Sequence, residues 1–262
     1  MKVLLRQLRD ELVPLLIWTL VLSSLAYYVA SLYASGLLGG LEDLLATLPP
    51  TLRAFLGDLD IKGLDGWLNM EHFAWMPLYI GFYAGVTASA LIAREADARS
   101  LELLLAQPVR RGYVLAGKFG SFAAGVVLIH LGMLAGLAWG IARAGEVGNW
   151  PAYWLLALNS ILVALAIGAW CLLISVLVND QRRAVMLGSG LVLLLFFTNA
   201  ILRSSGRSKA FLSLLNPFGH YDSAAVLKTG SIPWGAVAWL AGSIAVALGM
   251  AAWTFSDKDV SF

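Results

Sequence analysis

The stretch that decides the fold is Tyr153–Val178, YWLLALNSILVALAIGAWCLLISVLV, which contains no Asp, Glu, Lys or Arg. The hydrocarbon core of a membrane is about 30 Å thick and requires roughly 20 apolar residues of helix to cross it. A charge near the middle of an inserting helix costs roughly 2.5–3.5 kcal/mol. The stretch therefore predicts a membrane-spanning helix.

Five further stretches are also about long enough to cross a membrane and lack the same four residue types. The predicted spans are residues 12–34, 73–93, 119–142, 153–178, 184–202 and 234–253. The whole chain of 262 residues is 60% hydrophobic and 13% charged, whereas soluble domains average about 25% charged residues. We therefore expect one all-α polytopic membrane domain over 1–262. The net charge of +2 gives no support to a nucleic-acid partner.

The basic residues orient the predicted spans, because short cytoplasmic loops of membrane proteins are enriched in Lys and Arg. If the amino terminus is cytoplasmic, eleven of the eighteen basic residues face the cytoplasm. They are Lys2, Arg6, Arg9, Arg94, Arg99, Arg110, Arg111, Lys118, Arg182, Arg183 and Lys258. The external segment 35–72 is mainly acidic and is expected to form short surface helices. We expect a multi-pass protein with both termini cytoplasmic, as in a prokaryotic inner membrane.

Two segments outside the spans are predicted to form cytoplasmic helices. Residues 2–11 place leucines on one helix face and basic residues elsewhere, which is typical of an interfacial amphipathic helix in contact with lipid. The connection 94–118 is the most charged part of the chain. In it, Ser100 is suited to cap a short helix from Leu101 that ends before Pro108.

The run Glu95–Lys118 resembles the permease subunits of type-2 ATP-binding-cassette exporters. The similarity lies in an acid just after the second span, the core SLELLLA at 100–106, then PVRR at 108–111 and Gly117-Lys118 before the third span. The stretches 2–12, 215–218 (LNPF) and 255–259 (FSDKD) resemble other elements of that family.

The resemblance implies a coupling loop at 94–118 that contacts a separate nucleotide-binding ATPase subunit. The coupling positions that it implies are Glu95, Glu102, Pro108, Arg110 and Arg111. It further implies a second permease copy, or a homologous permease, and outward transport. ATP and Mg²⁺ would be bound by the partner subunit, and this chain would be neither an enzyme nor a holder of a cofactor or metal.

One apparent nucleotide motif is dismissed. Gly112–Lys118 matches the first seven positions of the phosphate-binding pattern GxxxxGK[ST], but Phe119 replaces the hydroxyl residue that would hold magnesium. Any ATP hydrolysis is therefore expected from another polypeptide.

Small residues predict close helix packing. Gly132, Gly136 and Gly140 lie on one face of the third span, and Gly235, Gly242 and Gly249 recur every seven residues in the last span. Such stripes let helix backbones approach closely. The sequence leaves open whether each stripe packs within the chain or forms a dimer seam.

Polar residues within the spans give two alternative functions. An ion-coupled secondary transporter would need ionisable groups at depth, and His130 is the one that the spans offer. We expect His130 instead to be a neutral histidine that forms a hydrogen bond between helices. An intramembrane enzyme would need paired aspartates or a serine in Gly-x-Ser-Gly with a histidine, and neither pattern occurs. For Asn159, Ser160, Thr198 and Asn199 we expect hydrogen bonds between helices. The scarcity of buried charge favours an amphipathic cargo.

Overall fold

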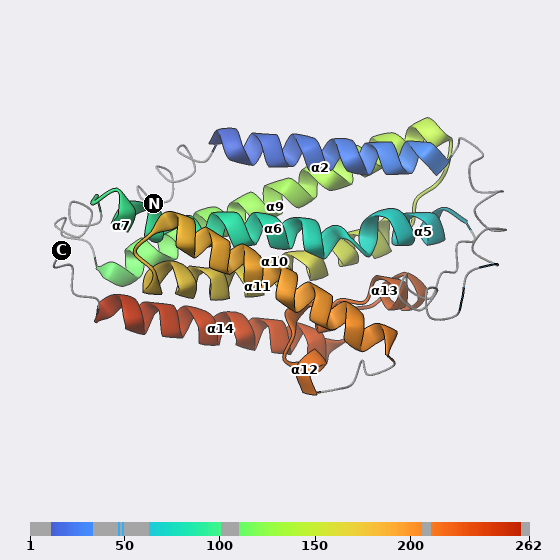
Figure 1. The fold of residues 1–262 in the computed structure, drawn as a ribbon. Coiled ribbons are helices and arrows are strands. Elements are labelled where there is room, and N and C mark those ends of the chain that lie inside the picture. Colours follow the sequence, from blue (N-terminus) through green and yellow to red (C-terminus); the bar gives the residue numbers. More distant parts are fainter. Residues whose placement is uncertain are drawn as a thin grey trace.

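The computed structural model describes residues 12–33, 47, 49, 63–100, 110–205 and 211–257, and within them it is helical without strands (Figure 1). The long helices are α2 (Leu12–Leu32), α6 (Met76–Ala90), α9 (Arg111–Ala144), α10 (Trp150–Leu177), α11 (Gln181–Ser204) and α14 (Trp234–Ser256). The short ones are α5 (Gly63–Leu68), the π-helical η2 (Asn69–Phe73), α7 (Ala93–Asp97), α12 (Phe211–Leu214), the 3₁₀ turn η3 (Pro217–His220) and α13 (Ser223–Thr229).

Six helices of the described part are long and apolar enough to cross a membrane, which confirms the predicted all-α architecture with six spans. Local chemistry sets several of their ends. Pro77 and Pro151 lie in the first turns of α6 and α10, where a missing N–H costs nothing. Gly145, in the left-handed conformation, ends α9, and the Asp180 carboxylate caps α11 by accepting from the N–H of Arg183.

The bundle is built around α10, which packs against α6, α9 and α14. Helix α2 packs against α9, and α11 packs against α6. As a result α2 and α14 lie at opposite edges of the bundle (Figure 1). We call the end that carries α7 the α7 end and the end that carries α5 the α5 end.

The two glycine stripes have different environments. A Cβ added at Gly136 would lie 2.1 Å from the carbonyl oxygen of Ser23 in α2, and Gly132 and Gly140 are similarly close to that helix. The stripe on α9 therefore packs within the chain. By contrast, a Cβ at Gly235, Gly242 or Gly249 would meet no heavy atom within 4 Å among the described residues, so that face of α14 is open.

The second span differs from the predicted range. Residues 63–72 were expected in a surface segment, but α5 and η2 lead directly towards α6, and Gly63–Asp97 is long and apolar enough to count as one candidate span. Polar residues made this region look extramembrane. Asp65 accepts hydrogen bonds from the Tyr153 hydroxyl (2.5 Å) and the Asn149 amide (3.2 Å), so the bundle accommodates it. The rest of the external segment lies almost wholly outside the described residues.

Residues 216–221 form an irregular segment between α11 and α14, and most of them are buried against the bundle. In it, Phe218 is 3% exposed and lies under α6, where a Cβ at Gly81 would be 3.3 Å from its ring. In a membrane protein, backbone outside a regular α-helix is tolerated where protein surrounds it. This is the LNPF stretch that the sequence singled out.

Polar side chains hold that segment in place. The amide of Asn199 donates to the carbonyl of Phe218 (3.3 Å), and the amide of Asn159 donates to that of His220 (3.3 Å). The expected bonds between helices are therefore present for these two residues, and their partner is the short helix η3 rather than another long helix. Tyr221 donates its hydroxyl to the Phe73 carbonyl (2.9 Å). Burial raises the pKa of Tyr221, which keeps the hydroxyl a donor.

Candidate functional site: the root of the coupling segment

The chain that leaves α6 breaks its helix before entering α7. Helix α6 ends at Ala90, and the main-chain N–H groups of Ile92 and Ala93 donate to the hydroxyl oxygen of Ser175 in α10, at 2.9 and 3.0 Å. The first N–H groups of a helix have no partner within it and need a cap. The residue before α7, Ile92, has no side chain able to accept them. A fully buried serine from another helix therefore serves as the cap.

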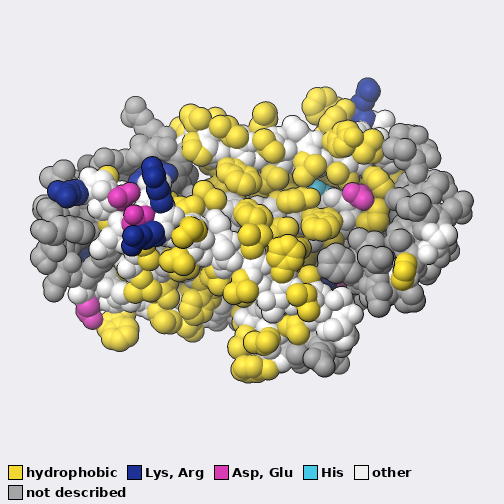
Figure 2. All heavy atoms as spheres, viewed as in Figure 1, with side chains coloured by type: hydrophobic (Ala, Val, Ile, Leu, Met, Phe, Trp, Pro, Cys, Tyr) yellow, Lys and Arg dark blue, Asp and Glu magenta, His cyan; other side chains and the backbone are white. Residues whose placement is uncertain are grey.

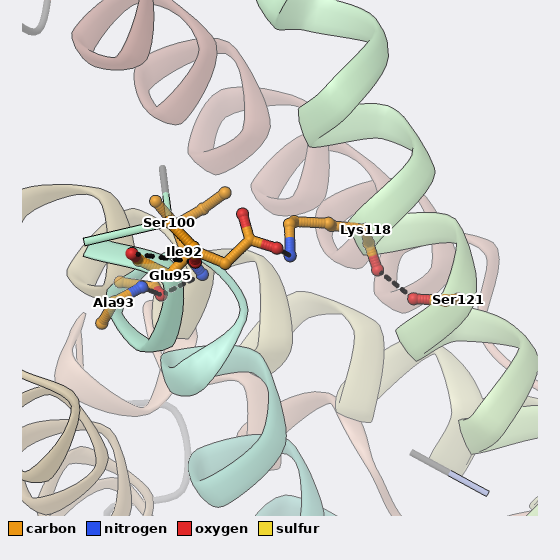
Figure 3. A network of polar contacts seen from close by, with 7 residues as sticks. Ile92, Ala93, Glu95, Ser100, Lys118 and Ser121 are labelled. Carbon is orange, nitrogen blue, oxygen red and sulfur yellow. Dashed lines mark hydrogen bonds and ion pairs between the residues drawn. The ribbon is translucent and has the colours of Figure 1, made fainter. Parts of the chain in front are cut away.

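Glu95 in α7 is paired with Lys118 in α9. The Lys118 Nζ donates to the Glu95 Oε1 at 2.8 Å, and the two side chains are 3% and 24% exposed, respectively (Figure 3). The other carboxylate oxygen, Oε2, is buried and finds no hydrogen-bond partner within the described ranges. An ammonium group this deeply buried requires a counter-charge, so the pair fixes α7 against α9.

Lys118 also corrects the predicted span boundary. The sequence placed it in the cytoplasmic loop just before a span at 119–142, but α9 begins at Arg111 and Lys118 lies two turns inside it. Helix α9 therefore starts two turns before the predicted span and includes the charged Lys118. The charge is tolerated because Glu95 neutralises it, and because it lies near the α7 end of the helix.

Helix α7 ends in a Schellman motif. The N–H of Ser100 donates to the Glu95 carbonyl at 2.9 Å and the N–H of Arg99 to the Ala96 carbonyl at 3.1 Å, which is the bond pattern of this ending. Arg99 has a φ of 52°, a conformation that usually belongs to glycine. The Ser100 hydroxyl also donates to the Glu95 carbonyl (3.3 Å), so it stabilises the end of α7. The helix predicted from Leu101 lies outside the described residues.

The predicted coupling positions separate into two groups. Glu102 and Pro108 lie outside the described residues. The interfacial segment 2–11 and residues 101–106 of the SLELLLA core lie outside them as well. Among the rest, Glu95 lies at the centre of the contacts just described. Arg110 is exposed and precedes α9.

Arg111 ties α9 to the end of α14. Its guanidinium Nη1 donates to the carbonyls of Phe255 (3.0 Å) and Ser256 (2.9 Å). The last carbonyls of a helix lack partners within it and carry partial negative charge. Arg111 therefore acts as a cap for α14, a role that the sequence did not indicate.

Sequence reasoning missed Lys118 and Ser175. One signal for Lys118 was available: it is a lysine flanked by apolar residues on both sides, at the start of a span that follows a loop beginning with an acid. Nothing in the sequence marks Ser175, which resembles any small polar residue near a span end.

The surface around this root is charged, whereas the flank of the bundle is apolar. Figure 2 shows basic and acidic side chains gathered at the α7 end and hydrophobic side chains along the length of the helices. Arg94, Asp97 and Arg99 are all exposed there. A charged, exposed segment rooted by buried polar contacts is suited to bind a soluble partner.

A family model supplies the identification. Residues 50–260 match the ABC-2 family transporter protein. The chain belongs to the ABC-2 transporter family. A search of the curated proteins gives no match to the chain.

Family membership confirms the central prediction from the sequence. The ABC-2 chain is a multi-pass membrane permease component of an ABC-type transporter, and this family of permeases is a transport component that is not itself an ATPase. The apparent phosphate-binding run Gly112–Lys118 agrees with this, because it lies in the continuous helix α9 rather than in a loop. A helix cannot wrap its backbone N–H groups around a phosphate as such a loop does.

The structure also shows the environment of His130, the histidine that an ion-coupled secondary transporter would need. His130 in α9 is 1% exposed, and its Nδ1 lies 2.8 Å from the Val126 carbonyl of the same helix. The sequence predicted a neutral histidine bonded between helices, and the bond is instead within its own helix. A ring nitrogen next to a carbonyl carries its proton there.

Proposed function

We propose that this ABC-2 permease is the membrane-spanning part of an exporter and is driven by a separate ATPase subunit that docks on the segment 94–118. The observation that supports the proposal is the root of that segment, where buried Ser175 and Lys118 hold α7 against two different spans. Solvated loops rarely have buried polar anchors, because each anchor orders the chain at an entropic cost.

The α7 end is proposed to face the cytoplasm. It carries Arg94, Arg99, Arg110, Arg182 and Arg183 on its exposed surface, and an excess of basic residues marks the cytoplasmic side. Helix α2 begins and α14 ends at this end of the bundle (Figure 1). Both termini would then be cytoplasmic, in a prokaryotic inner membrane.

The working unit is proposed to contain two permease chains and two ATPase subunits. ATP and Mg²⁺ would be bound by the ATPase subunits, and the second permease would be another copy or a homologous chain. When ATP closes the two ATPase subunits on each other, they move the coupling segments, and the permease pair passes its cargo outward.

The proposal is tested by reconstituting the chain in proteoliposomes with a candidate soluble ATPase, such as one encoded next to its gene. We expect the two to copurify and the complex to hydrolyse ATP. Replacing Glu102 and Arg110 together by alanine should reduce copurification or ATP hydrolysis, and replacing Lys228, a basic residue at the opposite end, serves as the control. Gradient-driven, ATP-independent uptake by the chain alone would instead establish a secondary transporter and overturn the proposal.

A further inference from the structure

The helical backbone hydrogen bonding is interrupted between α6 and α7. A continuous helix would bond the N–H groups of Ile92 and Ala93 to carbonyls one turn earlier, but both N–H groups donate to Ser175 instead. Leu91, just before them, bonds only three residues back, to the Ala88 carbonyl at 3.3 Å. Without these i to i−4 bonds the junction bends more easily than a helix does.

Two buried contacts provide other routes. Ser175 joins the start of α7 to α10, and Lys118 joins the middle of α7 to α9 (Figure 3). Ser175 is 0% exposed and Lys118 is 2% exposed. Water cannot replace the hydrogen-bond partners of these two buried side chains. Breaking either contact is therefore costly.

We propose that Lys118 and Ser175 are positioning residues that transmit displacement of α7 to α9 and α10 rather than along α6. This inference rests on the proposed function, since an ATPase subunit must displace the segment. Because α9 is packed against α2 through its glycine stripe, a displacement of α9 also carries α2. The edge helix α2 would thus move together with α9.

Hydrogen–deuterium exchange measured by mass spectrometry tests this route. The sample is the purified complex of the full chain with its ATPase subunit in lipid nanodiscs, compared without nucleotide and trapped with ATP and vanadate. In the wild type we expect trapping to change exchange in residues 93–100, in the first turns of α9 and in the last turns of α10.

Two single variants remove the two contacts. In Lys118→Met and in Ser175→Ala, trapping should still change exchange in residues 93–100, but the change should be lost in α9 for the first variant and in α10 for the second. Ser121→Ala is the matched control, because the Ser121 hydroxyl donates to the Lys118 carbonyl of its own helix at 2.7 Å. The reversed pair, Glu95→Lys with Lys118→Glu, should restore the response of α9 if loss of the ion pair is the cause.

The outcomes separate this inference from the proposed function. If α9 and α10 still respond in both variants, or if the wild type responds in α6 instead, the proposed route is overturned. If residues 93–100 of the wild-type complex do not respond to nucleotide, or if no ATPase subunit copurifies, the docking proposal itself fails.

Discussion

At the scale of single residues, two features of the α7 end affect its stability in opposite directions. Glu95 supplies the counter-charge for Lys118, whose side chain is 3% exposed. Arg99 adopts a backbone conformation that costs a residue with a Cβ about 1–2 kcal/mol. The ion pair stabilises the site. The backbone conformation of Arg99 is a local strain that the surrounding contacts offset.

Neutralising Glu95 should expose the dependence of Lys118 on its partner. Glu95→Gln leaves the lysine buried without a counter-charge and is expected to destabilise the chain by about 2 kcal/mol, below the roughly 3–5 kcal/mol of fully buried pairs, because Glu95 is partly exposed. Tryptophan fluorescence during thermal unfolding in detergent measures this loss. Adding Lys118→Met should recover most of it, and a double variant as unstable as the single one would contradict the argument.

Relieving the strain at Arg99 should stabilise the end of α7. Arg99→Gly removes the Cβ, and even after the greater flexibility of glycine in the unfolded chain we expect a gain of up to about 1 kcal/mol. Arg99→Val should destabilise, since β-branched residues fit the left-handed region poorly. Exchange of the Ser100 amide with deuterium reports on both variants. Faster exchange in Arg99→Gly than in the wild type would show that the motif needs the arginine itself.

At the scale of helices, two glycine stripes of similar composition have different packing. The stripe on α9 lets the backbone of α2 approach, and the stripe on α14 faces open space among the described residues. Helices with small residues pack closely wherever a second helix is available. The composition of a stripe therefore shows only that a second helix could pack against it. The fold shows which stripe has such a helix against it.

A matched pair of substitutions compares the two stripes. Gly136→Ala would place a methyl group against the Ser23 carbonyl and should destabilise the protein by about 1–3 kcal/mol. The methyl group of Gly242→Ala meets no neighbour among the described residues, and the change should be neutral or slightly stabilising, because alanine favours helix over glycine. Both are measured by thermal unfolding of the purified chain. Equal losses would indicate that the α14 stripe is packed against a second chain.

At the scale of the whole molecule, the bundle has a charged end and an end closed by short helices. The α7 end carries the rooted segment, and at the α5 end α5 is tied to α2 by a hydrogen bond from the Trp67 indole to the Val29 carbonyl at 2.8 Å. The two ends therefore differ: the α7 end presents charged side chains to a partner, whereas at the α5 end a hydrogen bond connects α5 to α2.

Cysteine labelling of intact cells tests which end faces outward. With Cys171 replaced by serine, Val147→Cys, which lies in the loop after α9 and is 91% exposed, should react with a membrane-impermeant maleimide. Ala98→Cys, after α7, should react only once the membrane is permeabilised. The reverse pattern would place the coupling segment outside and contradict the proposed orientation.

The sequence predicted the spans because the cost of burying charge in lipid acts on each segment separately. It could not predict the contacts that connect segments. Lys118 meets Glu95 across 23 positions, and Ser175 meets Ile92 across 83, so neither partner is visible within one helix. The same limit applies to Asn159 and Asn199, whose polarity within spans was noted but whose partners lie in a segment that loops back into the bundle.

The buried segment around Phe218 has a consequence for the order in which the protein is made. Its carbonyls accept from Asn159 and Asn199, and Tyr221 reaches the Phe73 carbonyl, so it completes contacts on three earlier spans. Ribosomes deliver those spans first, and their polar groups lack these partners until residues 216–221 emerge. The hydrogen bonds between these spans and residues 218–221 can therefore form only after the fifth span has been synthesised.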